Sequence, residues 1–281
     1  MILLPNSIID PVIKRALAED MGDAGDITSD AVVARGATAS AEMTSRKLGT
    51  LAGLFVARRV YELLNPDIEP QITSGEGSAC KQGDTLIKLT GSARTILMGE
   101  RVALNFLGHM SGIATATAQL VASVSHTKAK ICCTRKTTPG LRAFEKYAVR
   151  MGGGINHRFG LHDGILIKDN HIAVAGGVAD AVKKAQSVAG HMVKIEVEVD
   201  SLDQLEKALT AGVDVIMLDN MSMHLMKDAV QIVRGRAILE ASGSITTDTA
   251  PEIAELGVDV ISSGWITHSA PALDVGLDFL S

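Results

Sequence analysis

Aromatic residues are scarce in this chain of 281 residues, of which phenylalanine, tyrosine and tryptophan together make up 3%. This scarcity argues against a protein that binds single-stranded nucleic acid, because such proteins stack bases on aromatic side chains. The net charge of −5 also argues against a duplex-binding surface, which needs an excess of lysine and arginine. We therefore expect no nucleic-acid partner.

Long apolar runs are missing as well, and none reaches the length of about 20 residues that a membrane-spanning helix needs. The N-terminal segment lacks the cationic start and the small-residue cleavage site of a signal peptide. The cysteines Cys80, Cys132 and Cys133 are odd in number and lack CxxC spacing, which excludes a disulfide framework and a CxxC metal site. These absences predict a cytoplasmic protein without a membrane partner.

The second half of the chain alternates short apolar runs with helix-like segments. This alternation is typical of βαβ units and predicts an α/β fold with a parallel sheet. No GxGxxG motif follows any of the runs and no GxxxxGK[ST] occurs, which favours a (β/α) barrel over a doubly wound open sheet. The predicted strands are 131–134, 165–167, 194–199, 214–219, 237–242 and 259–264, and the predicted helices are 174–189, 201–211, 222–233 and 247–256.

The first part of the chain has a different, α+β pattern. Apolar residues at helical spacing predict a helix within 1–20 and helices at 50–64 and 93–124, the last broken near Ser111 and Gly112. A segment rich in glycine and aspartate at 21–32 is interpreted as a loop. We therefore predict an N-terminal α+β domain at 1–108, joined by the tail 270–281, and a barrel catalytic domain at 109–269.

One stretch of this acidic chain is basic, since residues 134–171 hold seven lysines and arginines against three acidic residues. Cations that converge without acidic partners repel each other by about 3–4 kcal/mol per pair at close range, so such a cluster indicates an anion site. Arg142, Lys146 and Arg150 share one helical stripe and are interpreted as a solvated helix face. The candidates for anion binding lie at predicted strand ends or after glycines: Arg135, Lys136, His157, Arg158 and Lys168.

Every predicted strand ends in a polar, charged or small residue, and in a (β/α) barrel these ends meet at the rim that carries the active site. Glu198 and Asp219 would supply carboxylates there, and the Ser-Gly ends of the last two strands would supply backbone N–H groups for phosphate. Two carboxylates beside a phosphate site suit Mg²⁺. A glycosidase pair leaves the cationic residues unexplained, and the histidines lack zinc-site spacing with cysteine. The residues thus predict a phosphorylated, Mg²⁺-bound substrate and a compact, multiply charged anion.

Several long motifs resemble the quinolinate phosphoribosyltransferases, also called carboxylating nicotinate-nucleotide pyrophosphorylases. The resemblance covers essentially the whole chain, from EDMGDAGDITSD at 19–30 to GWITHSAPALD at 264–274. Its longest motif spans residues 134–172. The other matching motifs are ERVALNFLGHMSGIAT (100–115), EVEV (196–199), MLDN (217–220) and EASGSI (240–245).

The resemblance implies a pentosyltransferase of NAD biosynthesis that transfers phosphoribosyl from phosphoribosyl pyrophosphate (PRPP) to quinolinate. Its products would be nicotinate mononucleotide, CO₂ and pyrophosphate. The resemblance further implies an open (β/α) barrel of about seven strands, Mg²⁺ as the cofactor, and a homodimer in which Arg101 reaches the neighbouring subunit's site.

Site residues also follow from the resemblance. Lys136, Lys168, Glu198 and Asp219 are implied as catalytic residues, and both carboxylates as Mg²⁺ ligands, directly or indirectly. The implied substrate-binding residues are Arg101, Thr134, Arg135, Lys136, His157, Arg158, Lys168, Glu198, Asp219, Ser242, Gly243, Ser244, Ser262, Ser263 and Gly264.

Ser244 departs from the family pattern, which usually has glycine there. A serine adds a Cβ and a hydroxyl close to the expected phosphate. Two alternatives stay open: a related phosphoribosyltransferase of the type linked to molybdate transport, and a non-catalytic oxyanion-binding protein. The intact LIKDNHI motif at 166–172 favours the biosynthetic enzyme, and oxyanion binding alone would not need Glu198 and Asp219.

Overall fold

A computed structural model describes residues 3–68 and 70–280. The outermost residues of the predicted N-terminal domain and tail, 1–2 and 281, lie outside this part. By spatial compactness the chain forms two units: unit 1 holds Met1–Ala118, Thr138–Gly153 and Ser269–Ser281, and unit 2 holds Gln119–Thr137 and Gly154–His268. The segments 109–118 and 138–153 thus lie in unit 1, and the predicted domain boundary after residue 108 stays a prediction.

Unit 1 is built on an antiparallel sheet of order β12-β1-β5-β3. The long strands β1 (Thr38–Ser45) and β5 (Thr85–Ser92) pair at its centre, with β3 (Gln71–Ile72) at one edge. At the other edge the tail strand β12 (Val275–Phe279) pairs with β1, and Leu277 lies opposite Met43. A separate two-stranded sheet joins β2 (Gly49–Thr50) and β4 (Ala79–Cys80).

The helices of unit 1 are amphipathic. Helix α1 (Asn6–Met21) buries Ile9, Ile13 and Leu17, which recur every four residues and so lie on one face. Helix α3 (Leu54–Leu64) begins after Gly53, whose positive φ of 94° suits glycine. The remaining helices are α2 (Ile27–Val32), α4 (Ala93–Ser123), whose last residues belong to unit 2, and α5 (Arg142–Met151).

Three sequence predictions for unit 1 are wrong. The segment 21–32 is not all loop, because Asp26 caps helix α2 by accepting a hydrogen bond from the Ser29 N–H at 2.9 Å. Helix α4 is not broken at Ser111 and Gly112: the serine hydroxyl donates to the Ala52 carbonyl, and a Cβ on the glycine would lie 2.2 Å from the Pro271 carbonyl oxygen. Tertiary packing therefore explains both residues inside the helix.

The predicted solvated face of helix α5 is the third correction. Lys146 is only 3% exposed, whereas Arg142 is half-buried and Arg150 is exposed. The helix is buried along much of its surface, with the aromatic ring of Phe144 stacked on Phe106 at a centroid distance of 5.5 Å. The lysine therefore belongs to the interior of unit 1.

Unit 2 contains a parallel sheet of six strands in the order β6-β11-β10-β9-β8-β7. Their bounds are β6 Lys130–Cys132, β7 Ile165–Ile167, β8 Ile195–Val199, β9 Val215–Asp219, β10 Ile238–Ser242 and β11 Val260–Ser262. All six lie where the sequence predicts strands. Ile155 forms an isolated parallel bridge with Cys132 and so adds one residue beyond β6. The structure therefore has six strands and this bridge where about seven strands were expected.

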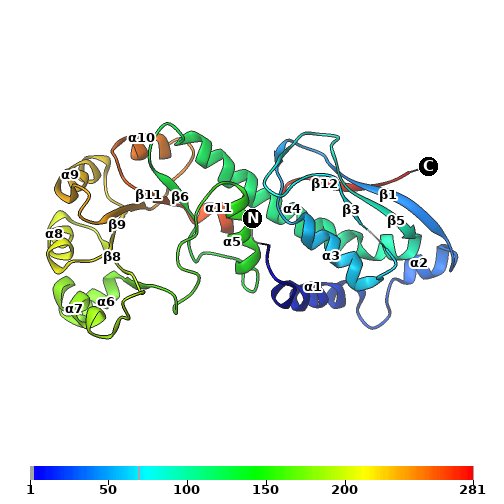
Figure 1. Cartoon of the computed structure of the whole chain (residues 1–281), viewed down its shortest axis with the longest axis horizontal. Coiled ribbons are helices and arrows are strands. Elements are labelled where there is room, and N and C mark those ends of the chain that lie inside the picture. Colours follow the sequence, from blue (N-terminus) through cyan, green and yellow to red (C-terminus); the bar gives the residue numbers. More distant parts are fainter. Residues whose placement is uncertain (1–2, 69, 281) are drawn as a thin grey trace. The chain divides into compact units, whose positions relative to one another are not determined.

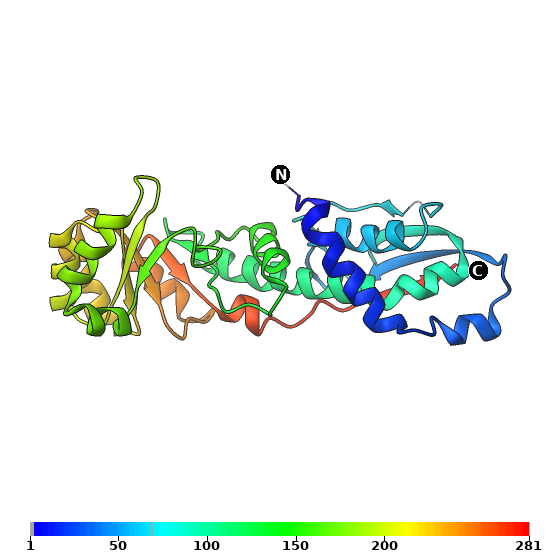
Figure 2. The ribbon, with the colours of Figure 1, turned by 90° about the horizontal axis from the view of Figure 1, so that it is seen from below.

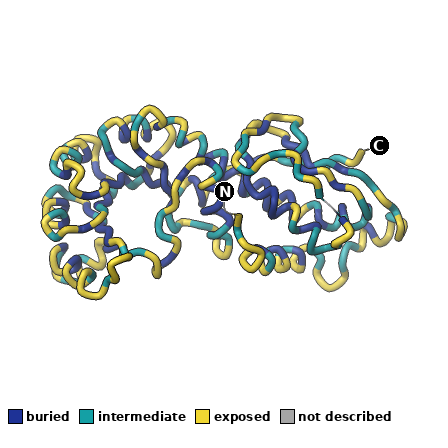
Figure 3. Tube along the Cα trace, in the orientation of Figure 1, coloured by how far each residue is buried: buried dark blue, intermediate teal, exposed yellow. Residues whose placement is uncertain are grey.

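Helices cover the outer side of this curved sheet (Figure 1), and the turned view shows them on the same side (Figure 2). They are α6 (Asp169–Ala175), α7 (Val178–Val188), α8 (Leu202–Ala211), α9 (Met223–Val233) and α10 (Ala250–Glu255), and a short α11 (Trp265–His268) follows. The strands are largely buried, whereas the outer helix surfaces are exposed (Figure 3).

Local details in unit 2 refine the sequence predictions. The helix predicted at 174–189 is α7, which begins later than predicted because Gly176 and Gly177, both at positive φ, separate it from α6. The Ser222 side chain caps α9 by accepting a hydrogen bond from the Leu225 N–H at 3.4 Å. Ser201, at the corresponding position before α8, makes no side-chain cap hydrogen bond. In the part of the chain that the structure describes, no helix is long and apolar enough to cross a membrane.

Candidate active site

A cavity of about 1060 Å³ lies in unit 2 where the parallel strands end. Its size is at the upper end of the range for small-molecule sites, which leaves room for two small substrates. Of the predicted site residues, all except Arg101 line it. They are Thr134, Arg135, Lys136, His157, Arg158, Lys168, Glu198, Asp219, Ser242, Gly243, Ser244, Ser262, Ser263 and Gly264.

The two-residue period of a strand explains which residues of each strand face the cavity. Successive side chains of a strand point to opposite faces, so residues two apart share a face. Leu166 and Lys168 both line the cavity, and Met217 does so together with Asp219. In each pair the apolar residue lies deeper in the strand and the charged residue lies at its carboxyl end.

Lys168 and Glu198 form a direct ion pair across the ends of β7 and β8. The backbone N–H of Lys168 also donates to Nδ1 of His171 at 2.9 Å, which fixes the start of α6. From sequence, Lys168 was assigned to the anion-binding residues and Glu198 to the phosphate and Mg²⁺ side. In the structure the two side chains are in contact, so the cationic and acidic parts of the site are adjacent.

The loop after β6 is held by hydrogen bonds of its own. The Lys136 N–H donates to the Thr134 hydroxyl at 3.0 Å, and the Lys136 carbonyl accepts from the Thr267 hydroxyl at 2.7 Å. A Cβ on Gly264 would lie 2.9 Å from Cδ of Lys136. The glycine therefore leaves the lysine stem room beside the end of β11.

Arg135 and Arg158 are close enough to influence each other electrostatically. Burial lowers the pKa of Arg158, the charge of Arg135 lowers it further, and the carboxylate of Glu196 acts in the opposite direction. One guanidinium N–H of Arg158, on Nη1, donates to the Gly164 carbonyl at 3.0 Å. Two arginines on one cavity wall favour an anionic ligand that balances both charges.

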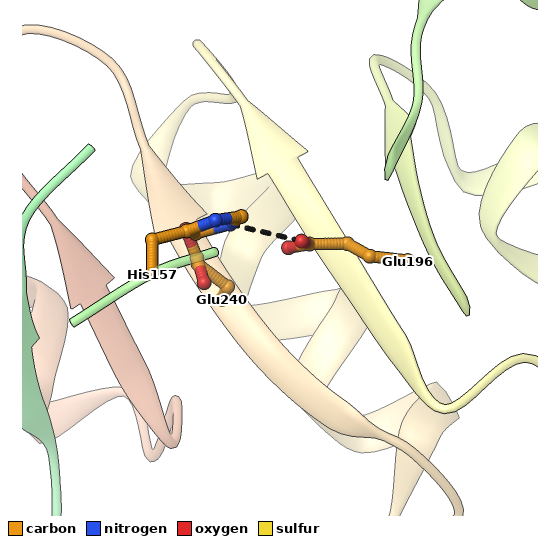
Figure 4. A group of neighbouring side chains, drawn as sticks. All are labelled: His157, Glu196 and Glu240. Atoms are coloured by element: carbon orange, nitrogen blue, oxygen red, sulfur yellow. Dashed lines mark ion pairs between the residues drawn. The ribbon is translucent and has the colours of Figure 1, made fainter. Parts of the chain in front are cut away.

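Two buried glutamates lie beneath this wall, and neither was named as a site residue from sequence. Glu196 on β8 and Glu240 on β10 face His157 (Figure 4) and are 7% and 4% exposed. The two-residue period could have found them, because each lies two residues before a predicted site residue, Glu198 or Ser242. A buried glutamate within a mostly apolar strand was the overlooked signal.

The ends of β10 and β11 present backbone instead of charge. A Cβ on Gly243, which has φ of 111°, would lie 2.1 Å from Oδ1 of Asn220. Ser244 also has a positive φ, 46°, a conformation that favours glycine. The departure from the family pattern therefore falls on a backbone position that a glycine would adopt without strain.

Glu198 and Asp219 offer the oxygen ligands that Mg²⁺ prefers, and both line the cavity. Asp219 accepts a hydrogen bond from the Asn220 amide at 2.9 Å. Glu198 is paired with Lys168, so an ion there would have to share this carboxylate. The donor set fits Mg²⁺ together with the oxygens of a phosphorylated substrate.

Arg101 lies apart from these residues in sequence and in compact unit. It is exposed on α4, where a second cavity of about 640 Å³ in unit 1 is lined by Arg101, Asn105 and His109 together with Arg15 and Glu19. Arg101 and Asn105 are exposed and lie one turn apart, so they share one face of α4.

Comparisons with known proteins cover nearly the whole chain. Residues 26–111 match the quinolinate phosphoribosyl transferase N-terminal domain, and residues 113–278 match its C-terminal domain. A probable nicotinate-nucleotide pyrophosphorylase [carboxylating] of Bacillus subtilis (strain 168) is 44% identical over 267 residues, 95% of this chain and 92% of the relative. The Mycobacterium leprae (strain TN) nicotinate-nucleotide pyrophosphorylase [carboxylating] is 44% identical over 271 residues, with 95% of both chains covered.

Solved structures agree in fold. NadC from Streptococcus pyogenes superposes with a TM-score of 0.95 at 43% identity, covering 100% of both chains. The nicotinate-nucleotide pyrophosphorylase from Francisella tularensis gives a TM-score of 0.95 at 41% identity, covering 99% of this chain and 98% of that one. On the two family domains and these relatives, the chain belongs to the quinolinate phosphoribosyltransferase family.

Proposed function

We propose that the chain transfers phosphoribosyl from PRPP to quinolinate with decarboxylation, giving nicotinate mononucleotide, CO₂ and pyrophosphate in NAD biosynthesis. The observation that carries this proposal is the content of one cavity. It brings Arg135, Arg158 and Lys168 together with two carboxylates and two Ser-Gly strand ends. This combination suits a small dicarboxylate beside a sugar phosphate.

Quinolinate occupies the cationic side of the cavity in this proposal. Arg135 and Arg158 bind its carboxylates through their planar guanidinium groups, and Lys136 and Lys168 supply point charges. Thr134 and His157 complete this wall. The repulsion between the two arginines in the free protein favours binding, because the dianion relieves it.

PRPP occupies the neighbouring side. The 5′-phosphate lies at the strand ends Ser242–Ser244 and Ser262–Gly264, whose serines and glycines line the cavity. The ribose faces Glu198 and Asp219. These carboxylates, with the pyrophosphate oxygens, would hold Mg²⁺, and the ion would neutralise the charge of the leaving group.

The reaction uses both sides. The C1–O bond of PRPP breaks with departure of pyrophosphate, and Glu198 and Asp219 stabilise the positive charge that develops on the ribose. The ring nitrogen of quinolinate forms the new bond to C1, and the fixed positions of both substrates supply proximity. The bond between C2 and its carboxylate then breaks, the cationic ring holds the electron pair as CO₂ leaves, and C2 takes up a proton.

We further propose a homodimer in which Arg101 enters the partner's site, which gives a role to an exposed arginine. Arg101→Ala should nearly abolish activity in a folded protein. Mixing it with inactive Arg135→Ala should restore up to about a quarter of wild-type activity, since half the randomly mixed dimers hold one intact site. No restoration after subunit exchange would reject the shared site.

The cytoplasm is the proposed location, because the odd number and the spacing of Cys80, Cys132 and Cys133 suit a reducing compartment. The direct test of the activity is incubation of the purified protein with quinolinate, PRPP and Mg²⁺, with product analysis by chromatography. We expect nicotinate mononucleotide and one CO₂ per product. Binding of quinolinate without any product would contradict the proposed transferase and leave an oxyanion-binding protein.

A further inference from the structure

His157 is held between two buried carboxylates and the backbone of its own neighbour. Its Nε2 lies 2.9 Å from Oε2 of Glu196 and 3.9 Å from Oε1 of Glu240. Figure 4 shows both glutamates directed at the imidazole ring. The side chains of the histidine, Glu196 and Glu240 are 11%, 9% and 5% exposed, so these contacts are largely shielded from solvent.

The other ring nitrogen determines the tautomer. The backbone N–H of Arg158 donates to Nδ1 of His157 at 2.8 Å. Nδ1 must then carry a lone pair, and the proton of the neutral ring lies on Nε2, where Glu196 accepts it. Both ring nitrogens are thus engaged within the chain. While these bonds last, His157 has no ring N–H to offer a substrate carboxylate, in contrast to the direct contact expected from sequence.

These contacts of His157 also fix the position of Arg158. The residue follows His157 directly, and the imidazole fixes its backbone through the Nδ1 hydrogen bond. Its guanidinium is anchored on the Gly164 carbonyl and lines the cavity. Glu196 also opposes the electrostatic effect of Arg135 on this arginine. Glu196 and Glu240 form a buried layer beneath the cavity wall. Through His157 this layer fixes the backbone of Arg158, and the carboxylate of Glu196 stabilises the charge of its guanidinium group.

Glu240 completes the layer. Burial raises the pKa of Glu240 to about 7, with a further contribution from the charge of Glu196. A protonated Glu240 can lie beside the carboxylate of Glu196 without the repulsion of two buried charges. In this layer the Glu196 carboxylate accepts the hydrogen bond from His157, and Glu240, on β10, is a neutral carboxyl group beside it.

The same three residues could hold a cation, because their ligand atoms all lie within 4.8 Å of one another. Two observations favour a proton instead. The Nε2–Oε2 distance of 2.9 Å is that of a direct hydrogen bond, and the Nδ1 contact supports the Nε2–H tautomer. Bound metal is therefore an outcome that the experiment must detect.

We propose that Glu196 and Glu240 are positioning residues for the dicarboxylate site, acting through His157 to orient Arg158. This inference rests on the proposed function for the identity of the dicarboxylate, quinolinate. It assigns two residues to the site and changes the role of His157 from a direct ligand to a link between the buried layer and the cavity wall.

The test combines Glu196→Ala, Glu240→Ala and the conservative Glu196→Gln with the exposed Glu206→Gln as matched control. Nitrogen NMR of histidine-labelled protein, assigned with His157→Asn, reports the tautomer without any turnover. We expect the signature of an Nε2–H that is hydrogen-bonded to a carboxylate in the wild type, and the loss of this hydrogen-bond shift in Glu196→Ala. Glu196→Gln, whose amide oxygen still accepts, should retain it, and Glu206→Gln should not differ from the wild type.

Binding and kinetics form the second arm. Because misplacing a binding group by about 1 Å can cost 100-fold, we expect both alanine variants to weaken quinolinate binding by about 10- to 100-fold in titration calorimetry. In turnover, KM for quinolinate should rise far more than kcat falls, and Glu196→Gln should recover most of the loss. Circular dichroism establishes that each variant is folded. If Glu196→Ala does not fold, Glu196→Gln replaces it in the binding and kinetic measurements.

Two results would overturn the inference. One is an unchanged His157 signature together with unchanged quinolinate affinity in both alanine variants. The other is one equivalent of a divalent metal in the purified protein, detected by elemental analysis and lost in both variants, which would make the cluster a metal site. A wild type that binds quinolinate but forms no product would contradict only the proposed function, because NMR and calorimetry do not depend on turnover.

Discussion

The two halves of the cavity recognise anions in different ways. The half formed by β6, β7 and the 157–158 segment uses long cationic side chains, whereas the half formed by β10 and β11 uses serines, glycines and their backbone. The charged half also rests on a buried layer that orients it, and the backbone half needs only the right dihedral angles. Long side chains have many rotamers to restrict, so they require supporting contacts that a backbone N–H does not.

The largest effect should come from the buried layer below the charged half. Glu240 has a folded-state pKa of about 7 against an ordinary value of 4.5, so its protonated form is favoured in the folded state. The stability it contributes is complete below pH 4.5 and is lost as pH rises through about 7. Relative to the wild type, Glu240→Gln should therefore gain about 3 kcal/mol in free energy of unfolding between pH 4 and pH 8.

Urea unfolding of Glu240→Gln and the wild type across this pH range measures the difference in their free energies of unfolding. Glu206→Gln is the exposed control. A gap between Glu240→Gln and the wild type that is the same at both ends of the range would show that Glu240 ionises in the fold at an ordinary pH. The charged half would then lack a neutral carboxyl beneath it.

Removing a cation from the charged half should have the next largest effect. Lys168→Ala removes a charge-assisted contact of about 1.5–3 kcal/mol, so KM for quinolinate should rise by about 10- to 100-fold and KM for PRPP by less. Lys207→Ala is the control, because Lys207 forms an exposed ion pair with Asp203 on α8. If KM for PRPP rises more than KM for quinolinate, Lys168 serves the PRPP side together with Glu198.

A smaller effect is expected from a methyl group in the backbone half. Gly243→Ala places a Cβ 2.1 Å from Oδ1 of Asn220 at a φ of 111°. The strand end must shift, at a cost of about 1–3 kcal/mol, and KM for PRPP should rise while KM for quinolinate stays close to wild type. Steady-state kinetics with each substrate varied in turn checks this. Equal changes in both constants would mean that the two halves are not independent.

The smallest effect should come from Ser244→Gly in the same loop. Glycine adopts the φ of 46° without strain but loses more backbone entropy on folding, so the free energy of unfolding should rise by less than about 1 kcal/mol. Thermal unfolding and KM for PRPP measure the result. A marked loss of PRPP affinity would instead assign the Ser244 hydroxyl a direct phosphate contact.

This difference between the halves also explains what could be predicted from sequence. The strands were found because each is a short apolar run, and the cavity residues because each run ends in a polar or small residue. β7, at Ile165–Ile167, matches its predicted range. The charge of a side chain follows from its residue type, so the charged half of the cavity was predictable.

Features that depend on tertiary contacts were not. The buried Lys146, the unbroken helix at Ser111 and Gly112, and the pairing of Lys168 with Glu198 all arise from neighbours distant in sequence. The positive φ of Ser244 likewise depends on the local fold. Glu196 and Glu240 are a separate case, because the two-residue strand period would have identified them.

The most direct test of the central claim is a crystal structure of the protein with quinolinate. The gathered cations should hold the dicarboxylate, with its carboxylate oxygens within hydrogen-bond distance of Arg135, Arg158 and Lys168, and His157 should keep its contacts to Glu196 and the Arg158 N–H. Quinolinate bound elsewhere, with these three side chains turned away from it, would contradict the account.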